Sequence, residues 1–330
     1  MLKNSFRAAL VILILFSSHP ARSDQTDSQG NPKKAVPAES RLQNVGGILI
    51  PQGSLQLEPA FIYSNYSRHR LSISGFTVLD AIVIGQMEVS DLKRDIIQTQ
   101  VTARYGITNR LEIEAKVPFL IRWDREVDAP GTTSATYHEA FGNGLGDIEG
   151  ALYWHAIRAN DGMPDIVLNT RVKSATGRSP YDLPQDSQGN LLDLPTGNGH
   201  WGVSAGFTAV KISDPAVLFG GVNYYWNFAR NVGGAYGTID PGNSIEYLLG
   251  MGYALNDKLS LDTSFQERFT MRDKQNGVAL PETYINASTL SLGISYAYSS
   301  RATLELMVGI GVTVDAPDLQ FTLSAPINVF

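Results

Sequence analysis

The sequence contains no cysteine among its 330 residues. A disulfide scaffold and thiolate-bound metal sites are therefore both excluded. Basic residues are also scarce, because 26 lysines and arginines stand against 32 aspartates and glutamates. The chain thus lacks the positive footprint expected of a nucleic-acid-binding protein. Long apolar runs are missing after the first residues, since polar side chains interrupt every later apolar stretch, and no transmembrane helix is expected.

The first 23 residues have the pattern of a secretory signal peptide. Lys3 and Arg7 form a positive start, residues 8–16 form an apolar run, and Ala21 and Ser23 are small residues at a cleavage site. The run is shorter than the roughly 20 residues of a spanning helix, and it is apolar on nearly every face, which argues against an amphipathic first helix. We expect export with cleavage after Ser23. Removal of three of the 26 basic residues leaves 23 against 32 acidic ones, a net charge of −9.

Two further regions follow the signal peptide. Residues 24–43 are polar, contain proline and serine, and lack aromatic side chains, which is typical of disorder. We therefore assign residues 24–53 to a disordered periplasmic tail and residues 54–330 to the folded domain. The folded domain begins with alternating apolar and polar side chains from Leu55 onwards, and this period of two predicts a β-strand with one apolar face.

The clearest alternation lies between Leu111 and Trp123, where every odd position is apolar and four even positions carry charge. One charged face and one apolar face suit a strand between a polar lumen and lipid, although a soluble sandwich would also accept this single strand. Twelve such segments of about ten residues occur, close to the length of a tilted spanning strand. They are residues 55–63, 97–105, 111–123, 148–157, 166–174, 201–211, 216–227, 245–255, 259–271, 288–298, 302–312 and 319–330.

The connections between these segments alternate in length. Short turns are expected at residues 106–110, 158–165, 212–215, 256–258 and 299–301, and long polar loops at residues 64–96, 124–147, 175–200, 228–244 and 272–287. Only residues 313–318 are short where a long loop is due. Short periplasmic turns opposite long outer loops are typical of a membrane barrel, whereas a sandwich has no reason to separate them. The sequence thus predicts an all-β, transmembrane, antiparallel up-and-down β-barrel of about 12 strands in the outer membrane.

Aromatic side chains gather near the strand ends on the apolar face. Such rings form the two girdles at the edges of the lipid-facing band of a membrane barrel; in a sandwich core they would lie in mid-strand. The predicted girdle consists of Trp123, Trp154, Trp201, Trp226, Tyr63, Tyr105 and Tyr253. The sequence ends on Phe330, an aromatic residue through which the outer-membrane assembly machinery is expected to recognise the last strand. Phe330 lies on the opposite parity to the apolar positions before it, and Pro326 is a candidate bulge that corrects this.

Several short motifs resemble those of the outer-membrane transporters grouped as the "putative MetA-pathway of phenol degradation" family. The resemblance rests on the order and spacing of residues 51–59 (PQGSLQLEP), 103–112 (ARYGITNRLE), 144–147 (GLGD), 173–177 (KSATG) and 194–199 (LPTGNG). It implies an outer-membrane channel linked to the catabolism of aromatic compounds, and it implies no catalytic residues.

No set of residues in the sequence indicates an enzyme, a cofactor or a metal. The four histidines after the signal peptide have no metal-ligand spacing, and His155, on the inward parity of its strand, is interpreted as a hydrogen-bonded lumen residue. An outer-membrane phospholipase would need a histidine and serine pair on the barrel exterior, and no histidine has that parity in mid-strand. The glycine-rich stretches 142–146 and 197–199 precede no helix that could hold a phosphate, so they are interpreted as turns.

Charged residues on the inward parity form a predicted lumen face. They either pair across strands and fill a narrow interior, or they line a solute path and set its selectivity. The set is Arg104, Glu112, Glu114, Lys116, Arg122, Glu149, Arg171, Lys173, Glu246, Asp262, Arg268 and Glu305. In the first outer loop, the apolar stretch Phe76–Gly85 either folds into the barrel mouth as a constriction or belongs to a hairpin that extends the barrel above the membrane.

These patterns favour a passive outer-membrane channel for small apolar or aromatic solutes, in contact with the lipid bilayer and without a cofactor. The alternative is a structural or adhesive barrel with a closed lumen that acts through its outer loops, and a third, weaker hypothesis is an outer-membrane hydrolase.

Overall fold

The computed structural model describes residues 46–73, 87–128, 136–159, 163–184, 192–213, 215–234, 236–281 and 283–330. The predicted signal peptide, residues 24–45 of the predicted tail, and the apolar stretch Phe76–Gly85 lie outside these ranges. None of the helices in the described ranges is long and apolar enough to cross a membrane.

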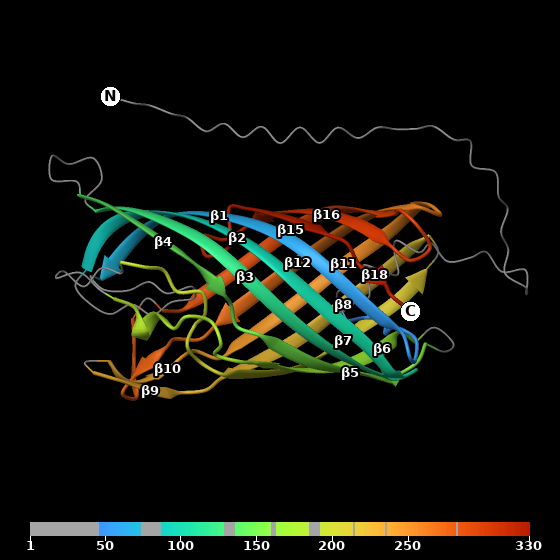
Figure 1. The fold of residues 1–330 in the computed structure, drawn as a ribbon, viewed down its shortest axis with the longest axis horizontal. Coiled ribbons are helices and arrows are strands. Elements are labelled where there is room, and N and C mark those ends of the chain that lie inside the picture. The colour runs from blue at the N-terminus through green and yellow to red at the C-terminus, as the bar shows by residue number, and fades with distance from the viewer. Residues whose placement is uncertain are drawn as a thin grey trace, which may run out of the picture. The chain divides into compact units, whose positions relative to one another are not determined.

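The described residues form a closed antiparallel β-barrel of twelve strands, each paired with its neighbours in chain order (Figure 1). Two of these wall strands are interrupted: β4 and β5 both pair with β3, and β17 and β18 both pair with β1. The prediction of a twelve-stranded up-and-down barrel is confirmed. The wall consists of β1 (Leu55–Ile73), β2 (Met87–Thr108), β3 (Leu111–Asp128), β4 (Thr136–Leu145) with β5 (Glu149–Ile157), β6 (Asp165–Lys173), β7 (Gly202–Ser213), β8 (Ala216–Asn227), β11 (Ser244–Asn256), β12 (Leu259–Thr270), β15 (Ile285–Ala297), β16 (Thr303–Gly311), and β17 (Leu319–Ser324) with β18 (Ile327–Asn328).

The barrel closes between its first and last strands. Phe61 of β1 pairs with Leu323 of β17, and Leu57 pairs with Ile327 of β18. The last strand is split between these two pairings, where Pro326 stands, and a proline has no N–H to give to a ladder. Phe330 is exposed, and its carbonyl oxygen accepts a hydrogen bond from the Leu55 amide at 3.0 Å.

The alternation in β3 separates the two faces of the wall. Glu112 is 2% exposed, whereas its neighbour Ile113 is 42% exposed. The apolar outward series continues to Trp123 and ends at Arg125, which forms an exposed ion pair with Glu139. Ten residue steps of about 3.3 Å, tilted by about 40°, correspond to a band of about 25 Å, the height of the apolar band of outer-membrane barrels.

Two of the connections predicted as long loops are partly strand. The loop expected at 64–96 is shorter because β1 runs to Ile73 and β2 starts at Met87, and the loop expected at 124–147 is shorter because β3 runs to Asp128 and β4 starts at Thr136. These extensions were missed because charged side chains such as Lys93 and Arg125 stand on the outward face, so no apolar alternation marks the strands. The pairing of β1 with β2 up to Ile73 and Met87 agrees with a hairpin around the first outer loop.

Two other outer connections form a second sheet that the sequence did not predict. Strands β9 (Arg230–Gly233), β10 (Gly237–Asp240), β13 (Lys274–Gln275) and β14 (Val278–Ala279) pair in the order β14, β13, β10, β9. Its β9–β10 hairpin lies at the end of the barrel opposite the C-terminus (Figure 1). The remaining long connection contains one turn of 3₁₀ helix, η1 (Pro180–Asp182), which Ser179 caps at its N-terminus.

The last residues of the predicted periplasmic tail contact the barrel. Ile50 is 2% exposed, and its amide donates a hydrogen bond to Glu112 Oε2 at 2.8 Å. Ile48 and Leu49 pack against buried apolar side chains of the wall. The prediction of disorder is therefore corrected for residues 46–53. The apolar residues that follow the polar stretch pack against apolar side chains of the wall.

Candidate solute cavity in the barrel lumen

One network of charged side chains crosses four neighbouring wall strands, β1, β2, β3 and β5, and reaches β6. Arg104 on β2 donates through Nη1 to Glu58 Oε2 on β1 at 2.6 Å and through Nε to Glu114 Oε2 on β3 at 2.9 Å. All three side chains are at most 8% exposed. Because each buried charge has an opposite partner in contact, the desolvation of the network is compensated.

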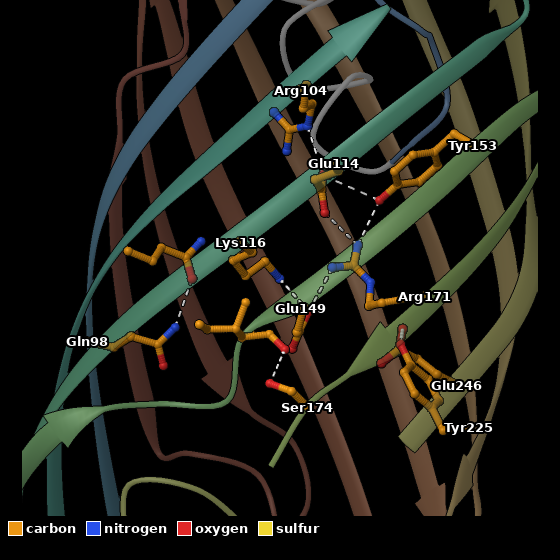
Figure 2. A network of polar contacts seen from close by, with 12 residues as sticks. Gln98, Arg104, Glu114, Lys116, Glu149, Tyr153, Arg171, Ser174, Tyr225 and Glu246 are labelled. Atoms are coloured by element: carbon orange, nitrogen blue, oxygen red, sulfur yellow. Dashed lines mark hydrogen bonds and ion pairs between the residues drawn. The ribbon is translucent and has the colours of Figure 1, made fainter. Parts of the chain in front are cut away.

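Arg171 on β6 joins this network to Glu149 and Lys116 (Figure 2). Its Nη1 donates to Glu149 Oε2 at 2.7 Å, and its Nη2 donates to the Tyr153 hydroxyl at 2.7 Å and lies 2.9 Å from Glu114 Oε1. Lys116 Nζ donates to the same Glu149 oxygen at 3.1 Å. Arg171, Glu149 and Lys116 are each about one quarter exposed, so they form the solvent-facing part of the network.

A second cluster lies on β8, β11 and β12. Arg268 Nη2 donates to Glu246 Oε2 at 2.6 Å, and Tyr225 donates its hydroxyl to Glu246 Oε1 at 3.1 Å. The Arg268 guanidinium also lies over the Tyr225 ring, with Cζ 4.4 Å from the ring centroid, a cation–π arrangement. The Arg268 side chain is 39% exposed and the Glu246 side chain is 9% exposed, so the cation presents its charge to the lumen.

The connection between β6 and β7 folds back onto the wall around Asp147. Asp147 Oδ2 accepts hydrogen bonds from Lys173 Nζ at 3.0 Å and from the Asn198 amide at 3.2 Å, and its Oδ1 accepts from the Gly177 amide at 3.0 Å. The two arms of the loop touch at Gly177 and Gly197, where a Cβ on Gly177 would lie 2.6 Å from the Gly197 nitrogen. The side chain of Asp147 and the two glycines therefore hold this loop to the barrel.

His200 closes the same loop against the neighbouring connection. Its Nε2 is 3.0 Å from the Tyr181 hydroxyl, and its Nδ1 is 2.9 Å from the carbonyl oxygen of Phe228. Burial, together with the nearby charges of Lys173 and Arg230, lowers the pKa of His200 below its usual 6.5. Burial also raises the pKa of the Tyr181 hydroxyl, so both side chains are neutral at pH 7.

A cavity of about 740 Å³ occupies the lumen beside these groups. Six of the charged residues predicted for the lumen face line it: Lys116, Glu149, Arg171, Lys173, Glu246 and Arg268. The other six are not part of its lining: Arg104, Glu112, Glu114, Arg122, Asp262 and Glu305. These six are buried, and their printed partners include Asp124 for Arg122 and Ser295 for Asp262. The alternation in the sequence thus indicated which side chains point inward. It did not indicate which of them reach the surface of the cavity and which are buried beside it.

The residues predicted for the aromatic girdle lie on the outward face. Six are more than 40% exposed, and Tyr63 is half-buried because its hydroxyl donates to Asp95 Oδ1 at 2.7 Å. The six are Trp123, Trp154, Trp201, Trp226, Tyr105 and Tyr253. His155 Nε2 lies 2.8 Å from Asp165 Oδ1. Within the described ranges, no group of three or more histidine, aspartate or glutamate side chains could hold a metal ion.

Sequence reasoning missed three residues that shape the cavity: Asp147, Tyr153 and Tyr225. Asp147 lies between two strands, where parity gives no information. The only signal for it was that the motifs 144–147, 173–177 and 194–199 share glycines, and the structure brings all three motifs together at this carboxylate.

A family model described as "Putative MetA-pathway of phenol degradation" matches residues 122–325. The chain belongs to this family. The match covers more than half of the chain and includes the three motifs around Asp147, whereas the motifs at 51–59 and 103–112 precede it. The resemblance predicted from the sequence is confirmed.

Solved structures show the same fold. The COG4313 outer membrane channel from Pseudomonas putida F1 is 14% identical, with 86% of this chain and 97% of that chain covered and a TM-score of 0.59. The translocator domain of the autotransporter NalP from Neisseria meningitidis (10% identity, 88% and 94% covered) and a Pseudomonas aeruginosa FadL homologue (10%, 85% and 91%) each have a TM-score of 0.40. The last two superpose too loosely to inform the site. The first shows that the MetA-pathway chain has the fold of an outer-membrane β-barrel.

Proposed function

We propose that this MetA-pathway protein is an outer-membrane channel for the passive passage of small aromatic solutes without net charge. The observation that carries the proposal is the cavity of about 740 Å³ inside a closed barrel whose outer face is apolar. This volume is within the range of small-molecule sites. A closed barrel with a lipid-facing exterior and a hollow polar interior is suited to passage through a membrane.

The charges of the lining favour solutes without net charge. Within the described residues, four cationic and four anionic side chains line the cavity, so the wall carries no surplus of either sign: Lys116, Arg171, Lys173 and Arg268 against Asp147, Glu149, Glu246 and Asp273. Selective ion pores instead present rings of one sign. Tyr153 and Tyr225 are among the lining residues, and the family description, which refers to phenol degradation, supports solutes with one ring and a hydroxyl group.

Growth on aromatic carbon sources tests this proposal. A strain without the gene should grow slowly on low concentrations of phenol and cresols, which carry no net charge at neutral pH, and the wild-type gene should restore growth. Met307→Trp places a large ring in the cavity lining, whereas Leu306→Trp, its neighbour in β16, places the ring on the exposed outer face. We expect Leu306→Trp to restore growth and Met307→Trp to fail. Equal growth of the deletion strain and the wild type on all of these sources would overturn the proposal.

A structural barrel with a closed lumen remains the second candidate, and one observation favours it: residues 46–50 occupy one end of the lumen. Ion conductance in planar bilayers separates the two candidates, because a permanently closed barrel conducts no current.

A further inference from the structure

The segment Gly46–Pro51, here called the N-terminal strap, lies inside the barrel near two of the short turns. The Gly53 amide, just after the strap, donates to the Gly106 carbonyl oxygen at 2.8 Å, beside the β2–β3 turn. Ile48 packs against Val210 and Val217, which flank the β7–β8 turn. The strap is therefore at the end of the lumen where the short, periplasmic turns are expected.

The strap contacts apolar side chains on different stretches of the wall. Ile48 packs against a cluster on β7 and β8 that includes Phe219 and is joined by Leu248 of β11. The next residue, Leu49, packs against a second cluster, which consists of Ala151 and Tyr153 of β5 and Val167 of β6. With the hydrogen bond from the Ile50 amide to Glu112 on β3, the contacts of the strap extend over five neighbouring strands of the twelve in the described wall: β3, β5, β6, β7 and β8. It thus borders about half of the lumen at this level.

The fit between the strap and the wall is close. Gly46 has a φ of 67°, and a Cβ at this position would lie 2.6 Å from Tyr153 Cε1. A Cβ on Gly106 would lie 2.2 Å from the Pro51 carbonyl oxygen. Both positions therefore require glycine. The apolar clusters under the strap border the polar cavity, because Tyr153 and Leu248 belong to these clusters and also line the cavity.

We propose that the N-terminal strap is a gate that closes the periplasmic end of the lumen and moves away from the apolar wall residues when a solute passes. The proposal rests on the channel function proposed above. The strap is joined to the wall by side-chain packing and by hydrogen bonds, of which the Ile50–Glu112 bond is one, and such contacts can break and reform without change to the barrel. The apolar wall residues that the strap contacts lie beside the polar cavity. A passing aromatic ring can therefore contact them once the strap has moved away.

A reversible covalent lock tests the gate. The wild-type sequence has no cysteine, so Leu49→Cys combined with Val167→Cys introduces a single pair, with one cysteine in the strap and the other in the wall cluster against which Leu49 packs. In planar bilayers, we expect the oxidised double variant to lose conductance to the level of the bare bilayer, and a reductant to restore it. Each single-cysteine variant is the matched control and should respond to neither treatment.

A second variant weakens the docking of the strap without a crosslink. Ile48→Ser with Leu49→Ser removes the apolar contacts, and we expect longer open times than in the wild type; heat-modifiable migration in SDS gels shows that the barrel has assembled. An oxidised, fully crosslinked double-cysteine variant that conducts like the reduced form overturns the gate and leaves the channel function intact. Absence of conductance in the wild type, the reduced variant and the double-serine variant alike overturns the channel function itself.

Discussion

Asp147 and Lys173 form an ion pair of 3.0 Å at the root of the loop between β6 and β7. The carboxylate also accepts hydrogen bonds from the Gly177 and Asn198 amides. Asp147→Asn keeps the shape of the side chain but removes its charge, and each weakened charged hydrogen bond contributes about 1.5–3 kcal/mol. We expect the variant loop to be cleaved by trypsin at Arg178 faster than in the wild type, while the barrel remains folded.

Asp193→Asn is the matched control for this loop. Asp193 pairs with Arg178, but both side chains are about one third exposed, and exposed pairs contribute little. The same cleavage rate for Asp147→Asn and the wild type would show that Asp147 does not hold the loop.

The two faces of β3 predict unequal effects for neighbouring substitutions. Val117 is exposed on the outward face, and Val117→Arg should lower the free energy of unfolding by roughly 2–4 kcal/mol if it lies near the bilayer midplane. Lys116→Ala, one residue away, removes a partly exposed ion pair with Glu149 and should have a much smaller effect. Urea unfolding of the lipid-embedded protein measures both, and effects of equal size would contradict the assigned faces.

Acidification should loosen the contact between His200 and Tyr181, because a protonated Nε2 can no longer accept a hydrogen bond from the Tyr181 hydroxyl. Because burial lowers the pKa of His200, the folded protein prefers the neutral ring. The stabilisation is fully present above the usual pKa of 6.5 and is lost as the pH falls below it, since the unfolded loop then binds the proton more readily. Tryptophan fluorescence from the adjacent Trp201 should report this change between pH 7 and pH 5. His200→Gln should remove most of the pH dependence, and an identical pH profile in that variant would assign the titration to another group.

Two glutamates of the interior should respond differently to the same change. Glu114 is buried between Arg104 and Arg171, so Glu114→Gln removes one of the two carboxylate partners of each cation and should cost stability, with the roughly 3–5 kcal/mol of a fully broken buried pair as the upper limit. Glu246 lines the cavity and its partner Arg268 is partly exposed, so Glu246→Gln should cost less stability and shift the ion preference towards anions. Reversal potentials and urea unfolding separate the two, and a selectivity shift in the Glu114 variant alone would contradict the assigned lining.

Cysteine labelling on intact cells tests the orientation of the barrel. Val278→Cys lies in β14 of the loop sheet and is exposed, whereas Asp257→Cys lies in the short turn between β11 and β12. A membrane-impermeant thiol reagent should label the first and not the second. Labelling of Asp257→Cys alone would invert the orientation.

The twelve strands could be predicted because lipid forces a strict alternation on every wall segment, as β3 shows between Leu111 and Trp123. The strand extensions to Ile73 and Asp128 could not, because outward charged residues such as Lys93 and Arg125 interrupt the apolar alternation there. Inward parity predicted Arg171 and Arg268 for the lumen face, and both line the cavity in the structure. It could not show that Glu112 lies beneath the N-terminal strap, since that contact joins residues 62 positions apart.

The seam of the barrel joins the two ends of the wall. Gln56 Nε2 donates to Asn328 Oδ1 at 3.0 Å, and these residues are separated by 272 positions. The loss of chain entropy on ring closure grows with the length of the closed loop, so this pairing has a greater entropic cost than any hairpin of neighbouring strands. Until it forms, β1 and β17 both present open edges, whose unpaired backbone groups cost several kcal/mol each in hydrocarbon. A chain of this design therefore has to join its two ends by the time its wall enters the hydrocarbon, so closure of the ring and insertion into the membrane are coupled.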